Sequence, residues 1–537
     1  MDIIRIGVGE KDRAGVEDIG AKAAILAQVA ALGLPVPPAF VLPIGLGAAL
    51  LAGDRTAERK FIEGLEKGIA FLEAATGKRF GDRRRPLLVS VRSGAAQSMP
   101  GMLDSVLDIG CTRQATRGLI RMTGNPRFAW DCRRRLLEDY VETVLGLDPA
   151  PFFARRDGLV SAEGAASDRD LDSEALERLA FAYERLLADA DQAVPDEPTQ
   201  QLIDAARSVY RSWSSDRAST YRRLQGLEHL KGTAVMVQAM VFGNRGSTSG
   251  AGVAFSRDPS TGGVEPVIEL LFEAQGEDVV AGRRTPETEA ELASRAPAIA
   301  RQLRGYLLDL EQAFKDVQDV EFTIEDGRLW ILQSRGAKRT ARAQLRIAVD
   351  LVREGLISAP QALQRLHGLD VPTLAIARFV GPARPIAQGI GAAGGVAVGR
   401  AVFDSGAAER LTAAGEPAIL IRFDVDTADV AGLAAATGLC TARGGRTAHA
   451  SLIARQLGKA CVVSCKGLMV SVDARHADID GTAIEEGDWI SIDGDSGEVF
   501  LGQREVVRER PEAELAEVER WRAEAVHQEG QAKLALA

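Results

Sequence analysis

Apolar side chains recur at the three- and four-residue spacing of amphipathic helices in several parts of the 537-residue chain. This spacing predicts a short helix over residues 20–32, which ends before Gly33 and a proline-rich turn. It also predicts a mostly helical region over 127–225 and further helices from about 340 to 370. A charged helix is predicted over about 508–533.

Short apolar runs bounded by turn signals predict strands. The Val- and Met-rich segment Thr233–Phe242 is one such run, and Val320–Leu332 predicts a hairpin around Asp326-Gly327. Residues 382–399 are rich in Gly, Ala and Pro, which predicts a hinge or the start of another domain. Residues 396–502 alternate short strands with helices. The pattern therefore predicts a multidomain protein of the α+β or α/β class.

Composition narrows the functional classes. The chain is 46% hydrophobic and 26% charged, as soluble globular proteins are. A net charge of −10 without a basic stripe argues against nucleic-acid binding. No apolar run reaches the roughly 20 residues that a membrane span needs. The five cysteines form no CxxC pair, which disfavours zinc and disulfide frameworks and predicts a reducing, cytoplasmic location.

His449 is one of five histidines and follows the loop residues Gly444-Gly445. Glycine permits positive φ and close backbone approach in that loop. The apolar positions after the histidine have helical spacing, which places His449 in the first turn of a helix that ends at Gly458; they are Ala450, Ile453, Ala454 and Leu457. A helix N-terminus favours neutral, nucleophilic imidazole and can hold a phosphoryl group. The alternative is an ordinary capping or partner-binding histidine.

A second candidate site follows the short apolar strand Leu87–Val91. The strand delivers Arg92 to a loop, and a small-residue turn, residues 98–101, comes next. Guanidinium groups bind phosphate oxygens in pairs, and the N–H groups of glycine turns form anion-binding nests. Arg92 and Gly101 are therefore candidate phosphate-binding residues. The alternative for Arg92 is a salt-bridge partner at a strand end.

The predicted hairpin carries a third group of polar residues, namely Asp319, Glu321, Gln333 and Arg335. If the acids and Gln333 share a face, their hard oxygen ligands suit Mg²⁺ that bridges nucleotide phosphates. The alternative is a solvated edge hairpin with alternating polar residues.

The register of the hairpin decides which face these residues share, and two turns are compatible with the sequence. A two-residue turn at 326–327 pairs Glu321 with Leu332 and puts Gln333 on the opposite face. A three-residue loop over 325–327 pairs Asp319 with Gln333, so that both acids, Gln333 and Arg335 share one face.

Together these segments resemble the pyruvate, phosphate dikinase family over about residues 15–505. The stretches that carry the resemblance include GAKAAILAQVAALGLPVPPAF, LLVSVRSGAAQSMPGMLDSVLDIG, VQAMVFGNRGSTSGAGVAFSRDPSTG, DVEFTIEDGRLWILQSR and TARGGRTAHASLIAR. Several long motifs in the same order are far more specific than any one of them.

The resemblance implies an ATP-grasp nucleotide-binding domain followed by a swivelling β/β/α phosphohistidine domain. The expected boundaries are 1–338 for the nucleotide-binding domain, 339–384 for a helical linker, 385–505 for the phosphohistidine domain and 506–537 for a C-terminal helix.

The resemblance also implies roles for individual residues. Lys22 and Arg92 would hold phosphates, and the adenine hinge would comprise Gln238, Met240 and Val241. In the metal site, Glu321 and Gln333 would bind Mg²⁺ with Asp319 close by, and Arg335 would contact the transferring group.

The same resemblance gives His449 the chemistry of a phosphoryl carrier. It would take pyrophosphate from ATP and pass the terminal phosphoryl group to inorganic phosphate, which leaves phosphohistidine, AMP and pyrophosphate. Thr447 resembles a threonine that a regulatory kinase phosphorylates in the family, while a simple capping role is the alternative.

Several departures from the family pattern affect these expectations, among them changes in the glycine loop and around the histidine. The glycine-rich GGKG loop of the family appears here as Gly20-Ala21-Lys22-Ala23, so the loop is expected to approach phosphate less closely. Around the histidine, Ala448 stands where the family usually has Ser, and Ser451 replaces Ala.

The family's third domain is a TIM barrel that binds pyruvate or phosphoenolpyruvate, and it needs roughly 250 residues. The segment after residue 505 is far shorter. We therefore expect a phosphotransferase that loads His449 from ATP and inorganic phosphate. Pyruvate or another acceptor would bind on a separate chain, and a homodimer is a further expected assembly. The alternative is a non-catalytic nucleotide-binding regulator derived from the dikinase.

Overall fold

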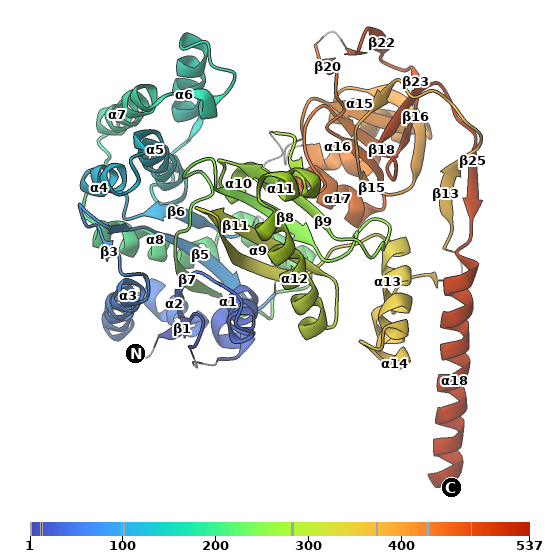
Figure 1. The fold of residues 1–537 in the computed structure, drawn as a ribbon, viewed down its shortest axis with the longest axis horizontal. Coiled ribbons are helices and arrows are strands. Elements are labelled where there is room, and N and C mark those ends of the chain that lie inside the picture. The colour runs from blue at the N-terminus through green and yellow to red at the C-terminus, as the bar shows by residue number, and fades with distance from the viewer. Residues whose placement is uncertain are drawn as a thin grey trace. The chain divides into compact units, whose positions relative to one another are not determined.

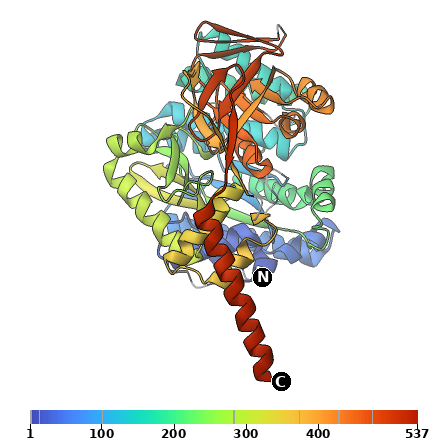
Figure 2. The same ribbon diagram turned by 90° about the vertical axis from the view of Figure 1, so that its right-hand side faces the viewer.

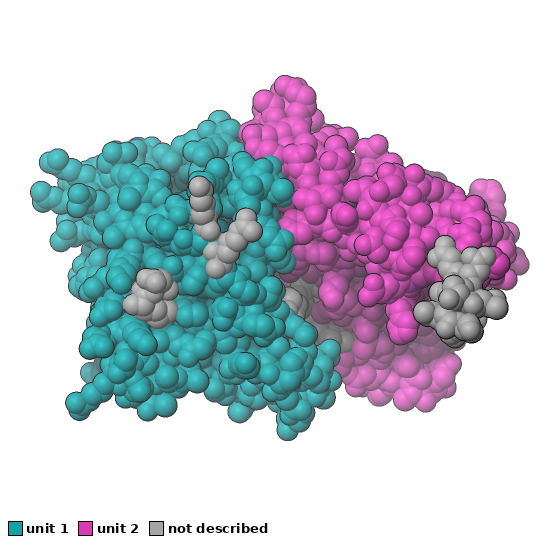
Figure 3. Space-filling model, turned by 90° about the horizontal axis from the view of Figure 1, so that it is seen from below, with its two compact units in different colours: residues 1–249, 323–334 teal, residues 250–322, 335–537 magenta. Residues whose placement is uncertain are grey.

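The computed structural model describes residues 3–10, 12, 14–97, 99, 102–280, 284–371, 374–425, 429–473 and 475–536, without the side chains of residues 280, 430, 449 and 528–536. The chain divides into two compact units, which Figure 3 colours separately. Unit 1 comprises Met1–Ser249 and Thr323–Ser334, and unit 2 comprises Gly250–Phe322 and Arg335–Ala537. The division passes through the predicted hairpin.

Unit 1 is built around a five-stranded sheet (Figure 1) with the order β1-β2-β7-β5-β6. Its strands are β1 (Ile4–Ile6), β2 (Ala39–Leu42), β5 (Val89–Ala95), β6 (Ser105–Ile109) and β7 (Thr233–Ala239). All neighbours in this sheet pair antiparallel. Every residue of β2 and β7 is buried, so both faces of the sheet are covered.

Helices supply that cover. Packed against the sheet are α1 (Val16–Ala31), α2 (Ile44–Leu51), α3 (Arg55–Thr76) and α8 (Pro198–Ser212). Apolar side chains of α2, α3 and α8 form one core with the strands. The short strands β3 (Arg79–Phe80) and β4 (Pro86–Leu87) pair with each other beside this core.

The region 127–225 is helical, as predicted. It contains α5 (Pro126–Thr143), α6 (Ala150–Ala162), α7 (Ser173–Asp189), α8 and α9 (Asp216–Leu224), and α4 (Arg113–Thr123) precedes it. Helices α5, α6 and α7 share a separate apolar cluster.

Unit 2 begins with strands β8 (Gly250–Phe255), β9 (Val267–Phe272) and β10 (Glu287–Thr288), which lie in the order β10-β9-β8 and continue into β11 (Gln318–Glu325). The helices of this part are α10 (Gly276–Val280), α11 (Glu289–Arg295) and α12 (Pro297–Phe314). Helices α13 (Ala341–Arg353) and α14 (Ala359–Arg365) confirm the helices predicted from about 340 to 370. They pack with α18 (Glu512–Leu536) in an apolar cluster that includes Trp521.

The histidine-bearing part of unit 2 is an eight-stranded sheet of order β14-β24-β23-β16-β17-β18-β19-β15. Its strands are β14 (Ala387–Gln388), β15 (Ile390–Ala393), β16 (Val396–Val402), β17 (Ala418–Arg422), β18 (Gly438–Thr441), β19 (Ala460–Val463), β23 (Trp489–Asp493) and β24 (Glu498–Leu501). Strands β16, β17, β18 and β19 are parallel. The connecting helices are α15 (Ser405–Ala413), α16 (Val430–Ala435) and α17 (His449–Leu457), and β20 (Leu468–Ser471), β21 (His476–Ile479) and β22 (Thr482–Glu485) form a smaller sheet.

The glycine-rich segment 382–399 is mostly strand, because it supplies β14, β15 and the start of β16. A two-stranded ribbon connects this part with the rest of unit 2 (Figure 2): β13 (Ile376–Phe379) pairs antiparallel with β25 (Val506–Glu509). The C-terminal helix predicted from 506 therefore begins only at Glu512, because the β-branched pair Val506-Val507 extends a sheet instead.

Two further predictions concern disulfide bonds and membrane-spanning helices. All five cysteines are buried free thiols, which confirms that no disulfide framework is present. Among the helices in the described ranges, none is both long and apolar enough to cross a membrane.

Candidate active site

The first helix of unit 1 is interrupted at Gly20, just before Lys22. Gly20 has φ 78° and ψ 160°, which are not helical values. An ideal Cβ on Gly20 would lie 2.1 Å from the carbonyl oxygen of Gly94 on β5. The helix therefore packs backbone to backbone against the strand that carries Arg92, and Lys22 lies in the first turn after the break.

Arg92 lies on β5, where its Cα pairs with Met236 of β7 on one side and Ser105 of β6 on the other. Its side chain is half-buried. Lys22 and Arg92 thus both belong to unit 1 and stand on two elements in direct contact. Gly101, the other candidate phosphate-binding residue of this segment, lies outside the described residues.

The candidate adenine hinge spans the end of β7, because Gln238 lies within the strand and Met240 and Val241 follow it. Gln238 is buried, and its Nε2 donates a hydrogen bond to the carbonyl of Pro37 at 3.2 Å. The N–H of Met240 donates to the carbonyl of Leu88 at 2.9 Å. Met240 and Val241 are half-buried. The N–H of Met240 is therefore used within unit 1, so an adenine ring would need other backbone groups of this segment.

The hairpin has a two-residue turn but not a uniform register. Strand β11 ends at Glu325, β12 (Arg328–Gly336) begins three residues later, and Asp326 and Gly327 between them have positive φ of 48° and 74°. A uniform two-residue turn would set Val317 opposite Gly336. Instead, the N–H of Ala337 donates to the carbonyl of Val317 at 2.9 Å. The register therefore shifts by one residue along the hairpin, and neither predicted register describes it throughout.

The shift brings Asp319 and Arg335 together. Nε of Arg335 donates to Oδ2 of Asp319 at 2.8 Å, so these two residues share a face as the three-residue loop had predicted. Burial raises the pKa of Asp319, and the nearby guanidinium of Arg335 only partly opposes that rise. Burial alone would lower the pKa of Arg335, but the charges of Asp319 and Glu321 outweigh it and raise that pKa.

The oxygen ligands on β11 fit a hard cation such as Mg²⁺. Oδ1 of Asp319 is buried and has no hydrogen-bond partner. Glu321 is half-buried and projects from the same face, two residues along the strand. Gln333 is buried on β12, in the part of the hairpin that belongs to unit 1. Within the described ranges no three His, Cys, Asp or Glu side chains form a metal cluster, so amide or phosphate oxygens would have to complete the coordination.

The predicted helix at the candidate nucleophile is present. Helix α17 begins at His449, and Gly458 ends it in the left-handed conformation with φ 65°. Ala448 is the N-cap and supplies no side-chain cap, so the helix start keeps N–H groups for an anion. The side chain of His449 lies outside the described residues. Leu457 is 44% exposed, so the apolar face predicted for this helix ends one turn earlier.

The structure explains why both Gly444 and Gly445, in the loop before this helix, are glycine. Gly444 has φ 111°. A Cβ on Gly445 would lie 2.6 Å from Oε2 of Glu269, so a side chain there would collide with the carboxylate. From within the helix, the hydroxyl of Ser451 donates to the carbonyl of Gly445 at 2.7 Å. The departure from the family at position 451 thus adds a hydrogen bond that ties the helix to its own loop.

Glu269 on β9 binds the loop with both carboxylate oxygens. Oε1 accepts the N–H of Arg446 at 2.6 Å, and Oε2 accepts both the N–H and the hydroxyl of Thr447 at 2.9 Å. Thr447 is buried by this contact. Strand β9 lies in the same sheet as β11, with β8 between them. The loop of the candidate nucleophile is therefore held on the sheet that carries Asp319 and Glu321.

Sequence reasoning missed Glu269. Its contact with Thr447 joins residues 178 positions apart, and no periodicity or turn signal connects them. The only local signal was a charged residue inside the otherwise apolar segment Val267–Phe272, which is buried on β9.

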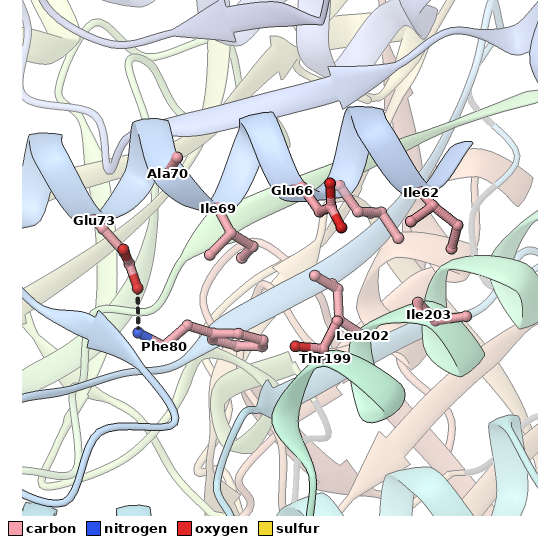
Figure 4. Close-up of a pocket in the computed structure, with 10 residues that line it drawn as sticks. Ile62, Glu66, Ile69, Ala70, Glu73, Phe80, Thr199, Leu202 and Ile203 are labelled. Carbon is pink, nitrogen blue, oxygen red and sulfur yellow. Dashed lines mark hydrogen bonds between the residues drawn. The ribbon is translucent and has the colours of Figure 1, made fainter. Parts of the chain in front are cut away.

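A cavity of about 240 Å³ lies elsewhere in unit 1, between α3 and α8 (Figure 4). Its walls are mainly apolar, with side chains such as Ile62, Ile69 and Leu202, and the carboxylates of Glu66 and Glu73 at its edge. None of the candidate site residues lines it. Apolar walls and carboxylates do not suit phosphate, so this cavity is no part of the candidate site.

Two family models match separate parts of the chain. The profile described as "Pyruvate phosphate dikinase, AMP/ATP-binding domain" matches residues 54–304 and 290–355. The profile described as "PEP-utilising enzyme, mobile domain" matches residues 414–497, which include His449.

Curated relatives extend the similarity over most of the chain. It is 39% identical over 493 residues to a pyruvate, phosphate dikinase of Clostridium symbiosum, covering 91% of this chain and 56% of the relative. It is 39% identical over 503 residues to chloroplastic pyruvate, phosphate dikinase 1 of Oryza sativa subsp. japonica, covering 93% and 53%. The corresponding protein of Arabidopsis thaliana is 40% identical over 492 residues, covering 90% and 51%. The chain thus spans about half the length of these relatives.

Proposed function

The chain belongs to the pyruvate, phosphate dikinase family, and we propose that it transfers a phosphoryl group from ATP to His449. Inorganic phosphate accepts the terminal phosphoryl group of the transferred pyrophosphate, so the products of loading are phosphohistidine, AMP and pyrophosphate. The phosphoryl group then passes to pyruvate or to another acceptor bound on a separate chain.

One observation carries this proposal: the loop before His449 is bound by Glu269 on the sheet that also contains Asp319 and Glu321. A phosphoryl acceptor and a set of acidic oxygens thus belong to one compact unit. In phosphoryl transfer, positioning and charge stabilisation supply most of the catalysis, and this arrangement offers both.

Unit 1 supplies the residues that would bind the phosphates of ATP. Lys22 follows the break at Gly20, and Arg92 stands on the strand against which that break packs. These two cations would hold the phosphates of ATP, with Gly101 contributing a backbone N–H. Gln238, Met240 and Val241 would border the adenine ring. The survival of Gly20, at the position of closest approach, supports this assignment although Ala21 and Ala23 replace family glycines.

The hairpin of β11 and β12 supplies the residues that would bind the metal ion. Glu321 and Gln333 would hold Mg²⁺, with Asp319 beside them, and the ion would neutralise charge on the phosphate oxygens. Arg335, which is ion-paired to Asp319 through Nε, would contact the transferring group with its remaining N–H donors. Thr447 would be a regulatory position, because a phosphate there would face the carboxylate of Glu269.

The test is to incubate the purified chain with ATP, Mg²⁺ and phosphate and to measure its intact mass. An acid-labile increment of one phosphoryl group is expected, and His449→Ala should abolish it while leaving ATP affinity nearly unchanged. His476→Ala is a matched control, because this histidine lies on β21 in the same part of unit 2. Equal loss of ATP binding and labelling in the His449 variant would contradict the two-domain assignment.

Isotope exchange separates the enzyme from the regulator. With labelled pyrophosphate, ATP, AMP and phosphate, the chain alone should exchange label into ATP. Labelled pyruvate and ATP should give no labelled phosphoenolpyruvate without a second chain. Absence of any exchange would favour the non-catalytic nucleotide-binding regulator, and phosphoenolpyruvate formed by the single chain would refute the need for a separate acceptor chain.

A further inference from the structure

Arg455 lies six residues after His449, in the last turn of α17, and is almost completely buried. Its side chain is 2% exposed, and among the described residues it forms no ion pair. Burying a cation without an ion-pair partner is unfavourable. A buried arginine in this situation therefore calls for a role that an apolar side chain could not fill.

The guanidinium of Arg455 connects three separate pieces of unit 2. Nε donates to the carbonyl of Ala392 on β15 at 3.1 Å, and Nη2 donates to the carbonyl of Arg446 in the loop before His449. The guanidinium carbon lies 5.2 Å from the ring centroid of Phe255 on β8. One planar group thus fixes the helix to its own sheet, to its own loop and to the neighbouring sheet.

The loop before His449 is consequently held at both backbone polar groups of Arg446. The N–H of Arg446 is bound by the carboxylate of Glu269, and its carbonyl is bound by Arg455. These two contacts hold the backbone at Arg446, between Gly445 and His449.

The positive charge of Arg455 is balanced by carboxylates that do not form an ion pair with it. Burial lowers the pKa of Arg455, and the negative charges of Glu269 and Asp319 on β9 and β11 oppose that effect. Nη1 is buried without a hydrogen-bond partner. The site is therefore not optimised for folding stability alone, which is common at functional positions.

We propose that Arg455 is a positioning residue for phosphoryl transfer, which holds the loop before His449 in the geometry needed to accept the phosphoryl group. This inference rests on the proposed role of His449. In this role Arg455 acts through the carbonyl of Arg446.

The test compares two substitutions with a control. Arg455→Met keeps the stem but removes the charge and all donors. Arg455→Lys keeps the charge but cannot reach both carbonyls in the same way. Arg410→Met is the control, because Arg410 is an exposed arginine on α15 in the same part of unit 2. Two properties are measured in the full chain: hydrogen exchange of the peptide covering 441–449, and the rate of phosphoryl labelling as a function of ATP concentration.

For Arg455→Met we expect at least tenfold faster exchange in that peptide and a 10- to 100-fold lower maximal labelling rate, since small misplacement of a reacting group has effects of this size. The KM for ATP should stay within twofold of the wild-type value. Arg455→Lys should lie between wild type and Arg455→Met, and Arg410→Met should match wild type.

Exchange and labelling both within twofold of wild type in Arg455→Met would overturn the proposal. Slow labelling with unchanged exchange would also overturn it, because the residue would then not act through the loop. If Arg455→Met fails to fold, Arg455→Lys decides: a normal melting temperature with slower labelling and faster exchange supports the proposal, and wild-type behaviour in both refutes it. If the wild-type chain is not labelled at all, the proposed function fails, whereas the exchange comparison still tests the role of Arg455 in holding the loop.

Discussion

Gly20→Ala is the sharpest test of the phosphate end of the site, because the structure defines what the added methyl group would meet. The methyl carbon would lie 2.1 Å from the carbonyl oxygen of Gly94 and 2.5 Å from its carbonyl carbon. Both atoms are backbone atoms of a central strand and cannot rotate away. The φ of 78° and ψ of 160° also lie in a region that only glycine adopts readily.

Two terms set the magnitude. Forcing a non-glycine residue into this region costs about 1–3 kcal/mol, and overpacking of a well-packed contact costs about 1–3 kcal/mol. We therefore expect the free energy of unfolding of unit 1 to fall by about 2–6 kcal/mol, a large share of the roughly 5–15 kcal/mol typical of a domain. Molecules that remain folded must move α1 away from β5. Lys22 then shifts relative to Arg92, and ATP affinity should fall by about 10- to 100-fold, or 1.4–2.8 kcal/mol.

Gly33→Ala is the matched control. Gly33 also has a positive φ, 81°, but an added Cβ would meet nothing within 4 Å. That variant should lose only about 1–2 kcal/mol of stability and bind ATP normally. Urea unfolding gives the stability of each variant, and calorimetric titration with ATP gives its affinity. If Gly20→Ala is no less stable than Gly33→Ala and binds ATP equally well, the close packing of α1 on β5 does not shape the phosphate site.

Three further predictions address other parts of the chain. Arg92→Ala and Glu321→Ala should leave the fold intact and reduce ATP-dependent labelling by at least about 10²; near-normal labelling at matched thermal stability would show that the pocket lies elsewhere. Thr447→Asp should strongly reduce labelling because it places a second carboxylate against Glu269, whereas Thr447→Val loses one hydrogen bond and should reduce it modestly; equal labelling rates in the two variants would count against electrostatic control. Burial raises the pKa of Glu325 above its ordinary 4.5. The folded state therefore binds the Glu325 proton more tightly than the unfolded state does, and the free energy of unfolding falls as pH rises from 4.5 to the raised pKa. Glu325→Gln should therefore stabilise the protein at pH 7 and lose this advantage towards pH 4.5 and below, which urea melts across that range would detect.

Local patterns predicted the elements of the fold well. The helical region 127–225, the helices near 340–370 and the hairpin at Asp326-Gly327 all follow from apolar spacing and turn residues. The histidine helix begins and ends where the glycines and apolar spacing placed it. These features depend on interactions between residues near in sequence, so a single sequence contains the relevant signal.

The hairpin register could not be predicted in the same way. A shift of one residue reverses the face of every side chain beyond it, and the sequence was compatible with two uniform registers. The structure combines a two-residue turn with a shift further along, and this combination places Asp319 opposite Arg335. The hairpin sequence has no marker for this irregularity.

Contacts between segments that are distant in the sequence could not be predicted either. Glu269 and Arg455 look unremarkable in their own segments, one as a charge in a strand and the other as a basic residue near a helix end. Their roles appear only when β9, β15 and the loop of α17 come together. The Gly-rich segment 382–399 was ambiguous for a related reason, because glycine is common both in hinges and where sheet backbones approach closely. Gly391 and Gly399 are of the second kind, since an added Cβ would meet backbone atoms at 2.5 and 2.9 Å.

The contact between Glu269 and the loop has to be specific and also reversible if His449 delivers its phosphoryl group elsewhere. Three hydrogen bonds to a carboxylate contribute about 1.5–3 kcal/mol each at most, and water replaces much of this when the loop is released. The remaining free energy of a few kcal/mol would leave a released population of about 0.1–10%. Because all three bonds end on one carboxylate, a single negative charge at Thr447 could reverse the balance. The contact that holds the loop before His449 on the acidic sheet would therefore make its release sensitive to one modification.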